Sequence, residues 1–137
     1  MSDLVAFLRA RLDDDEQVAR AAGAGVWTRE CGHTDFGGAD LPPGHDTCCV
    51  VSGDIHLYDE GGHDGDQAEH IARWDPARVL AEVAAKRGLI LLFEQQGERG
   101  TAHCHECPGP GLILGGVLQV LAAPYADHHD YRQEWTP

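Results

Sequence analysis

Residues 47–58, TCCVVSGDIHLY, contain two short runs of strand-favouring residues on either side of Ser52-Gly53-Asp54. Valine, isoleucine, threonine and tyrosine favour strands, and a short connection that contains glycine is typical of a hairpin turn. Residues 26–31 are a further candidate strand. This part of the chain therefore predicts a small antiparallel sheet.

Helical patterns lie on both sides of this sheet. Leu4, Leu8 and Leu12 recur at four-residue intervals, which predicts an amphipathic helix from residue 3 to about residue 22. Asp75-Pro76 combines a helix-capping side chain with proline at the first helical position, so we expect a second helix to run from there to about Gln96.

A third helix, short and buried, is predicted for residues 112–123, which are apolar on most sides and precede Pro124. The aromatic residues of the tail, Tyr125, Tyr131 and Trp135, should pack back onto the domain. The three helices and the small sheet should bury their apolar faces against each other in one core. Leu91 should also be buried. The residues predicted for that core are Leu4, Leu8, Val83, Ile90, Val117 and Leu121.

The remaining polar, glycine-rich stretches, residues 32–47, 59–66 and 98–111, are predicted to be loops. With 137 residues the chain has the size of one domain, and we expect a single domain over residues 1–137. The predicted fold class is α+β: an N-terminal helix, a small antiparallel sheet (hairpin), then two helices and an aromatic C-terminal tail.

The chain is strongly acidic, with a net charge of −13. This charge repels phosphate backbones and anionic lipid headgroups, so we expect neither a nucleic acid nor a membrane as partner. The acidic run at residues 13–16 covers more than one helical turn. It is either a solvated face that pairs with arginines such as Arg11 or Arg20, or a carboxylate cluster for a hard cation.

The five cysteines are an odd number, and the N-terminus lacks the pattern of a signal peptide. Both features predict reduced thiols and a cytoplasmic protein. The densest group of metal-ligand residues is residues 103–107, HCHEC, in which Cys104 and Cys107 have the spacing of a zinc-binding pair.

A structural zinc ion is the leading prediction for these residues. Two further ligands would come from Cys31, His33, His45, Cys48 or Cys49, which also have chelating spacings. Cys48 and Cys49 are neighbours on a predicted strand and point to opposite faces, so only one would join a given site. The alternative is that all five thiols are ordinary reduced, partly buried residues. The predicted metal ligands are Cys104, Cys107, Cys31, His33, Cys48 and His45.

Redox chemistry at Cys104 and the roles of three histidines are the remaining possibilities. Pro108-Gly109-Pro110 delays the next helix, so Cys104 lacks the helix N-terminus that activates a redox thiol. His70 either lines a cleft or is a half-buried histidine at the start of the long helix, and His128-His129 is either a surface metal site or a solvated corner.

Three segments together resemble a known family: LVAFLRARLD at 4–13, HIARWDPARVL at 70–80, and LAAPYADH at 121–128. The chain resembles a family of small actinobacterial and actinophage proteins catalogued as domain of unknown function 6221. The resemblance implies no activity, because the family has no assigned role.

We therefore expect a non-enzymatic, zinc-stabilised binding or accessory module that acts through an unknown protein partner. One alternative is a small metal-dependent hydrolase that uses His70 and nearby carboxylates. Another is an acidic decoy that mimics DNA. The sequence does not predict an oligomeric state.

Overall fold

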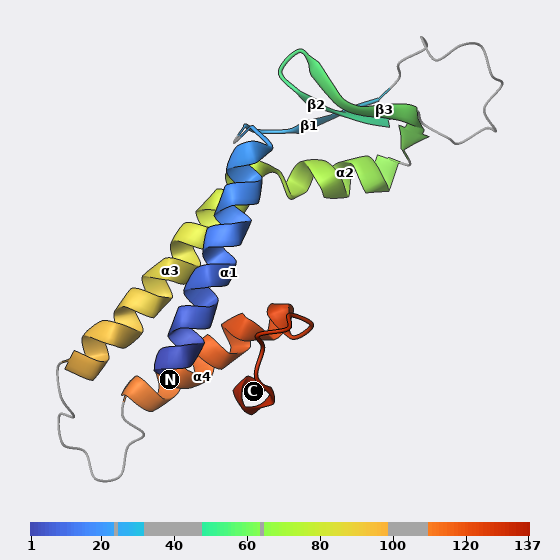
Figure 1. Ribbon diagram of the computed structural model, residues 1–137. Helices are drawn as coiled ribbons and strands as arrows, with labels where there is room; N and C mark the ends of the chain where they lie inside the picture. Colours follow the sequence, from blue (N-terminus) through green and yellow to red (C-terminus); the bar gives the residue numbers. More distant parts are fainter. Residues whose placement is uncertain (24, 32–47, 64, 99–109) are drawn as a thin grey trace. The chain divides into compact units, whose positions relative to one another are not determined.

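The computed structural model describes residues 1–23, 25–31, 48–63, 65–98 and 110–137 (Figure 1). The chain forms two compact units, one combining Met1–Gln17 with Ala81–Pro137 and the other comprising Val18–Leu80. Within the described ranges there are four α-helices and a three-stranded antiparallel sheet, which confirms the predicted α+β class. The assignment of the whole chain to a single domain stays a prediction.

The three predicted helices are all present: α1 (Ser2–Ala21), α3 (Pro76–Glu98) and α4 (Pro110–Ala122). Gly23 follows α1 with φ +104°, a conformation that glycine adopts without strain and that ends many helices. A short 3₁₀ turn, η1 (Ala123–Tyr125), follows α4 and contains Pro124. None of the helices in the described ranges has the length and apolarity needed to cross a membrane.

The first unit buries the apolar side of α1 together with residues of α3 and α4. Leu4, Leu8, Val83 and Ile90 are all at most 3% exposed, as predicted. In α4, however, the fully buried residues are Leu118 and Ala122, whereas Val117 and Leu121 are half-buried. Because α4 is apolar on most sides, its sequence pattern does not identify the face that is buried.

The prediction that Leu91 is buried is wrong, because this side chain is 52% exposed. It follows Ile90, which is 1% exposed, and successive helical residues point about 100° apart. Ile90 and Leu91 therefore cannot both point directly into the core.

The C-terminal tail packs against Phe7 of α1, as predicted. The ring centroids of Tyr125, Tyr131 and Trp135 lie 6.3, 6.0 and 5.0 Å from that of Phe7. Edge-to-face and tilted contacts at these distances stabilise the packing of aromatic rings. Trp135 lies in a second short turn, η2 (Gln133–Trp135), and is only 6% exposed.

The second unit contains the sheet, whose strands β1 (Thr28–Cys31), β2 (Cys48–Ser52) and β3 (Ile55–His63) are ordered β1-β2-β3. Both pairs are antiparallel. The predicted hairpin is confirmed, and Gly53 in its turn has φ +59°. The predicted loop at residues 59–66 is wrong. Residues 59–63 continue β3 as far as a pairing of His63 with Cys48, and residues 65 and 66 begin a helix. Backbone pairing can extend a strand without apolar side chains.

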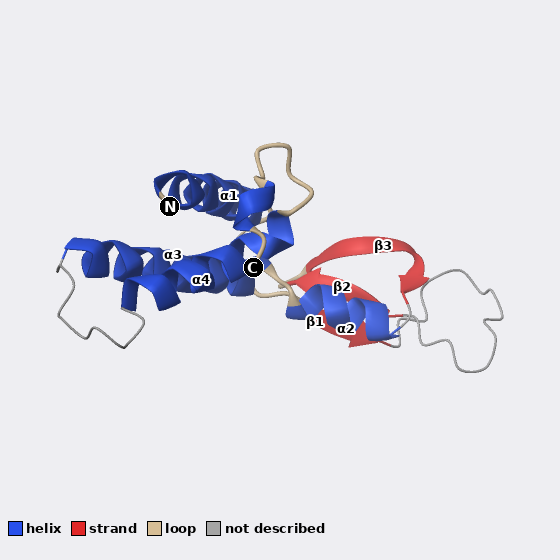
Figure 2. Ribbon diagram, turned by 90° about the horizontal axis from the view of Figure 1, so that it is seen from below, coloured by secondary structure: helices blue, strands red, loops and turns tan. Residues whose placement is uncertain are grey.

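An additional helix that the sequence pattern missed, α2 (Gly65–Arg73), packs on the sheet (Figure 2). Its Ala68 is fully buried with Cys48 and Val50, and Ile71 and Ala72 pack against this cluster. Ala68, Ile71 and Ala72 have the i, i+3, i+4 spacing of a helix face, but the helix has only nine residues and adjoins a glycine-rich stretch that was predicted to be a loop.

Asp75 caps α3, as predicted, and also ties the helix to the strand region. One carboxylate oxygen, Oδ1, accepts the backbone N–H of Arg78 at 2.7 Å, which is the N-cap hydrogen bond. The other, Oδ2, accepts the backbone N–H of Trp27 at 3.2 Å. Both oxygens of this carboxylate, only 8% exposed, are thus used in holding the second unit together.

Candidate functional sites: the strand cysteines and the C-terminal histidine turn

Two of the predicted metal ligands, Cys31 and Cys48, face each other across β1 and β2. Their Cα atoms are 4.1 Å apart and their sulfur atoms form a disulfide of 2.10 Å. The sequence-based expectation that all cysteines are reduced is therefore wrong for this pair. The physical reason is the strand register, which places the two side chains opposite each other on one face of the sheet.

The two halves of this cysteine pair have different surroundings. Cys48 is 2% exposed and belongs to the cluster under α2, whereas Cys31 is exposed. The sulfur of Cys48 also lies near the start of α2, since a Cβ atom placed on Gly65 would be 3.6 Å from it. Solvent can therefore reach the pair from the Cys31 side, while the other sulfur lies at a helix N-terminus.

The neighbouring Cys49 is buried, lies outside this disulfide and is paired in register with Glu30. Cys48 and Cys49 are both buried, and the pairing of β2 with β3 is irregular between Cys48 and Val50, so the expectation that the two cysteines point to opposite faces stays a prediction. The other predicted ligands, His33, His45, Cys104 and Cys107, lie outside the described residues. The structure thus places two of the predicted ligands together and leaves the others as predictions.

The acidic run of α1 is neutralised by partners in the first unit. Asp13 and Glu16 both form ion pairs with Arg87 of α3. The hydrogen bonds that the Arg87 guanidinium donates to these two carboxylates raise its pKa. Asp14 pairs with Arg11 at 3.1 Å. The prediction that carboxylates of this run pair with arginine is confirmed.

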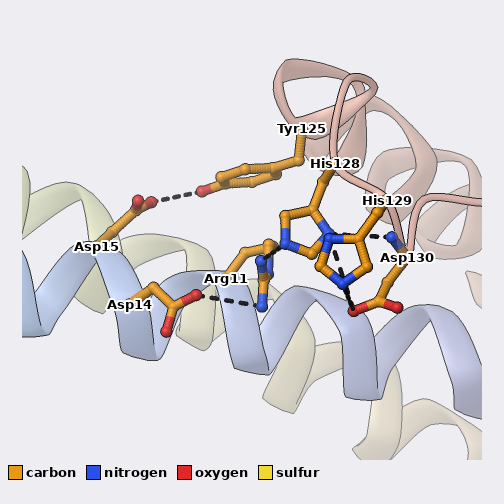
Figure 3. A network of polar contacts seen from close by, with 7 residues as sticks. All are labelled: Arg11, Asp14, Asp15, Tyr125, His128, His129 and Asp130. Atoms are coloured by element: carbon orange, nitrogen blue, oxygen red, sulfur yellow. Dashed lines mark hydrogen bonds and ion pairs between the residues drawn. The ribbon is translucent and has the colours of Figure 1, made fainter.

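A second polar network joins α1 to the residues that follow α4 (Figure 3). The Tyr125 hydroxyl donates a hydrogen bond of 2.6 Å to Asp15. Partial burial and this bond to a carboxylate together raise the pKa of the Tyr125 hydroxyl well above its usual value. Arg11 contacts Nε2 of His128 while it pairs with Asp14. Each residue of the acidic run therefore has an identified partner.

The same network contains a group of potential metal ligands, His128, His129 and Asp130. One ligand atom from each lies within 4.8 Å of the others. The carboxylate Oδ2 of Asp130 is 3.9 Å from Nδ1 of His128 and 3.3 Å from Nε2 of His129. The sequence signal was visible as consecutive histidines, but their side-chain directions depend on the turn that follows η1.

His70, considered above as a catalytic residue, lies beside the ring of Trp74, with centroids 6.4 Å apart. The prediction of a half-buried histidine at the start of the long helix is wrong, because His70 is exposed and belongs to the preceding helix α2. Asp75, the carboxylate that precedes α3, has both oxygens engaged by backbone N–H groups. These contacts give His70 and Asp75 structural surroundings rather than those of a catalytic pair.

Comparison with known proteins identifies a family but no function. No curated protein and no solved structure matches the chain. The family described as "Family of unknown function (DUF6221)" matches residues 1–137, the whole chain. The protein therefore belongs to the DUF6221 family of unknown function, as its three characteristic segments had indicated.

Proposed function

We propose that this protein is a non-enzymatic accessory module that acts through a protein partner in the cytoplasm, and that a zinc ion stabilises its sheet when the cysteines are reduced. The observation that carries the proposal is the register pairing of Cys31 with Cys48. Two thiolates on a shared tetrahedral zinc ion lie about 3.8 Å apart, given Zn–S bonds of about 2.3 Å. Facing strand positions supply this separation with little backbone movement.

The sequence around the pair offers ligands that would complete the coordination. His33 follows Cys31 by two residues, and His45 precedes Cys48 by three. A set of two cysteines and two histidines is a common structural zinc site. The other source of ligands is the predicted pair Cys104 and Cys107. The two ligand sets differ in which variants abolish zinc binding, so an experiment separates them.

The position of Cys48 favours the charged form that zinc requires. Its sulfur lies near Gly65 at the N-terminus of α2, where the helix dipole stabilises a negative charge. Arg29 also reaches this point, donating a hydrogen bond of 3.3 Å to the Gly65 carbonyl oxygen. A reduced Cys48 would therefore be a better thiolate ligand than an isolated buried thiol.

The disulfide and the zinc site exclude each other, because a bonded sulfur pair offers no thiolate. In a reducing compartment the pair would be held as thiols and would be available to the metal. Exposure of Cys31 gives a reductant access to the bond. The oxidised and the zinc-bound forms would both link β1 to β2, so either would hold the edge strand in place.

The surface properties support a protein as the partner. The net charge of −13 disfavours nucleic acid and anionic membranes. Ile55 and Leu57 of β3 are 66% and 38% exposed, and alternate residues of a strand share one face. A decoy that mimics DNA would need unneutralised rows of carboxylates, whereas Asp13 and Glu16 pair with Arg87.

The zinc content of the reduced protein tests this proposal. Protein purified in reductant and dialysed against buffer with trace zinc should retain one tightly bound equivalent. Cys31→Ser and Cys48→Ser should each lose it, whereas Cys49→Ser, a change at the adjacent strand position, should keep it. Loss in His45→Ala but not in Cys104→Ser would assign the two-cysteine, two-histidine set. The equivalent that counts is the one bound by the reduced protein beyond any zinc on the oxidised protein. Retention of that additional equivalent in both Cys31→Ser and Cys48→Ser would contradict the proposal.

A further inference from the structure

We infer that His128, His129 and Asp130 form a second metal site, independent of the cysteines, that binds a divalent transition-metal ion such as zinc. The site lies entirely in the first unit, in the turn that follows η1. It uses none of the residues on which the cysteine site depends. The two proposals can therefore fail separately.

The distances between the ligand atoms fit one ion. Tetrahedral ligands with bonds of about 2.0–2.2 Å lie about 3.4 Å from one another. The Asp130 carboxylate is 3.3 Å from His129 Nε2 and 3.9 Å from His128 Nδ1, and all the ligand atoms lie within 4.8 Å. Small side-chain rotations would bring these ligand atoms to the separation that one ion requires.

The turn holds the first of these ligands before any metal arrives. The backbone N–H of His128 donates to the Tyr125 carbonyl at 3.0 Å, and that of Tyr131 donates to the His128 carbonyl at 2.8 Å. The His128 ring packs edge-on against Phe7, with centroids 5.8 Å apart. Tyr125 is itself fixed by its bond to Asp15. Little ordering of His128 would therefore be needed when the ion binds.

The two imidazoles are also arranged together. Their rings stack at a centroid distance of 4.3 Å with 29° between the planes (Figure 3). His129 and Asp130 have side chains that are 82% and 64% exposed, so an ion can enter from solvent and keep water as a fourth ligand. Two imidazoles and one carboxylate select a borderline ion such as Zn²⁺ over Mg²⁺ or Ca²⁺, which prefer all-oxygen sites.

Metal binding would change two hydrogen bonds of His128. The backbone N–H of Asp130 is 3.1 Å from Nδ1, and Arg11 contacts Nε2. An ion on Nδ1 replaces the first contact and leaves the ring proton on Nε2, which faces the Arg11 donor. Arg11 would then be held by Asp14 alone, its partner at 3.1 Å. Metal binding should therefore weaken the contact between Arg11 and His128.

The test uses the full chain with Cys104→Ser and Cys107→Ser, kept oxidised so that Cys31 and Cys48 offer no thiolate. Titration with ZnCl₂, followed by calorimetry, should show one site and should raise the thermal midpoint. His129→Ala and Asp130→Asn should each weaken binding at least tenfold. The matched controls are His70→Ala and Asp127→Asn, an exposed histidine and an exposed aspartate outside the site, and both should bind as the parent does.

Nuclear magnetic resonance with Ni²⁺ provides a second readout that does not depend on stability. Paramagnetic broadening should centre on the amide signals of residues 125–131 and should disappear in His129→Ala. Mg²⁺ at the same concentration should shift none of these signals. No zinc binding by the oxidised parent, or equal binding by the parent, His129→Ala and Asp130→Asn, would overturn the inference without affecting the cysteine site.

Discussion

The two compact units of this protein differ in the contacts that stabilise the interior of each. The first buries several large apolar side chains, among them Leu4, Leu8 and Leu118, and adds an aromatic cluster around Phe7. The second has a three-stranded sheet, and its buried cluster consists of the smaller side chains of Cys48, Val50 and Ala68. A cluster of small side chains buries less apolar surface, so the unit gains more from a covalent or metal link. The Cys31–Cys48 bond lies in the unit that needs it more.

The largest effect is expected in the helical unit. Leu8→Ala removes a side chain that is 1% exposed and should destabilise the protein by about 2–5 kcal/mol. The matched control is Leu91→Ala in α3, where the side chain is 52% exposed and the cost should be below about 1 kcal/mol. Urea unfolding followed by circular dichroism measures both. Equal midpoints for the two variants would show that the packing of the first unit has been misassigned.

Loss of the disulfide should come next. A cross-link between residues separated by 17 positions in sequence stabilises the folded chain by about 3 kcal/mol. In metal-free buffer, reductant should lower the unfolding midpoint of the wild type. The double variant Cys31→Ser/Cys48→Ser should start at the lower value and respond to reductant no further. If reductant leaves the wild-type midpoint unchanged, the disulfide does not stabilise the second unit.

A smaller effect is expected from the cap of α3. Asp75→Ala loses the hydrogen bonds to Arg78 and Trp27 and should cost about 1–2 kcal/mol. The control is Asp127→Ala, an exposed aspartate in the C-terminal turn, which should be nearly neutral. Hydrogen exchange at the Trp27 amide is the direct readout, because this N–H has Asp75 as its acceptor. Unchanged protection of that amide in Asp75→Ala would contradict this role.

The smallest effect concerns the polar network of the first unit. The pKa of Tyr125 is raised in the folded state. The contribution of its protonated hydroxyl to the free energy of unfolding is therefore fully present below the ordinary tyrosine pKa of about 10 and is lost as the pH rises above that value. Wild-type stability should therefore fall between about pH 10 and 11 more steeply than that of Tyr125→Phe. Tyr131→Phe is the control. If the stability of the wild type and of Tyr125→Phe falls equally with pH, the Tyr125 hydroxyl does not contribute to stability.

Local patterns in the sequence predicted much of the fold. The leucine spacing of α1, the Asp75-Pro76 start of α3 and the Gly53 turn each depend on neighbouring residues, and all three are confirmed. The missed features depend on tertiary contacts. α2 packs on the sheet through Ala68, Ile71 and Ala72. Their i, i+3, i+4 spacing is helical, but it extends over only nine residues beside a glycine-rich stretch.

The candidate sites follow the same rule. Spacing along the chain suggested Cys31 and Cys48 as ligands, but only the register of β1 with β2 places them opposite each other. Cys49 is buried and lies outside the disulfide, which consecutive cysteines in the sequence do not by themselves determine. His128 and His129 were visible as a pair, whereas their approach to Asp130 required the turn after η1. Sequence spacing thus identifies potential ligands, and strand register and turn geometry determine which of them meet.

The central claim is that Cys31 and Cys48 hold zinc when reduced, and native mass spectrometry of the full chain with zinc tests it most directly. The reduced wild type should bind one zinc ion more than the oxidised wild type, because only reduction releases both thiolates. Cys31→Ser/Cys48→Ser should lose that redox-dependent ion, whereas His129→Ala should keep it. The same number of zinc ions on the reduced and the oxidised wild type would contradict the account.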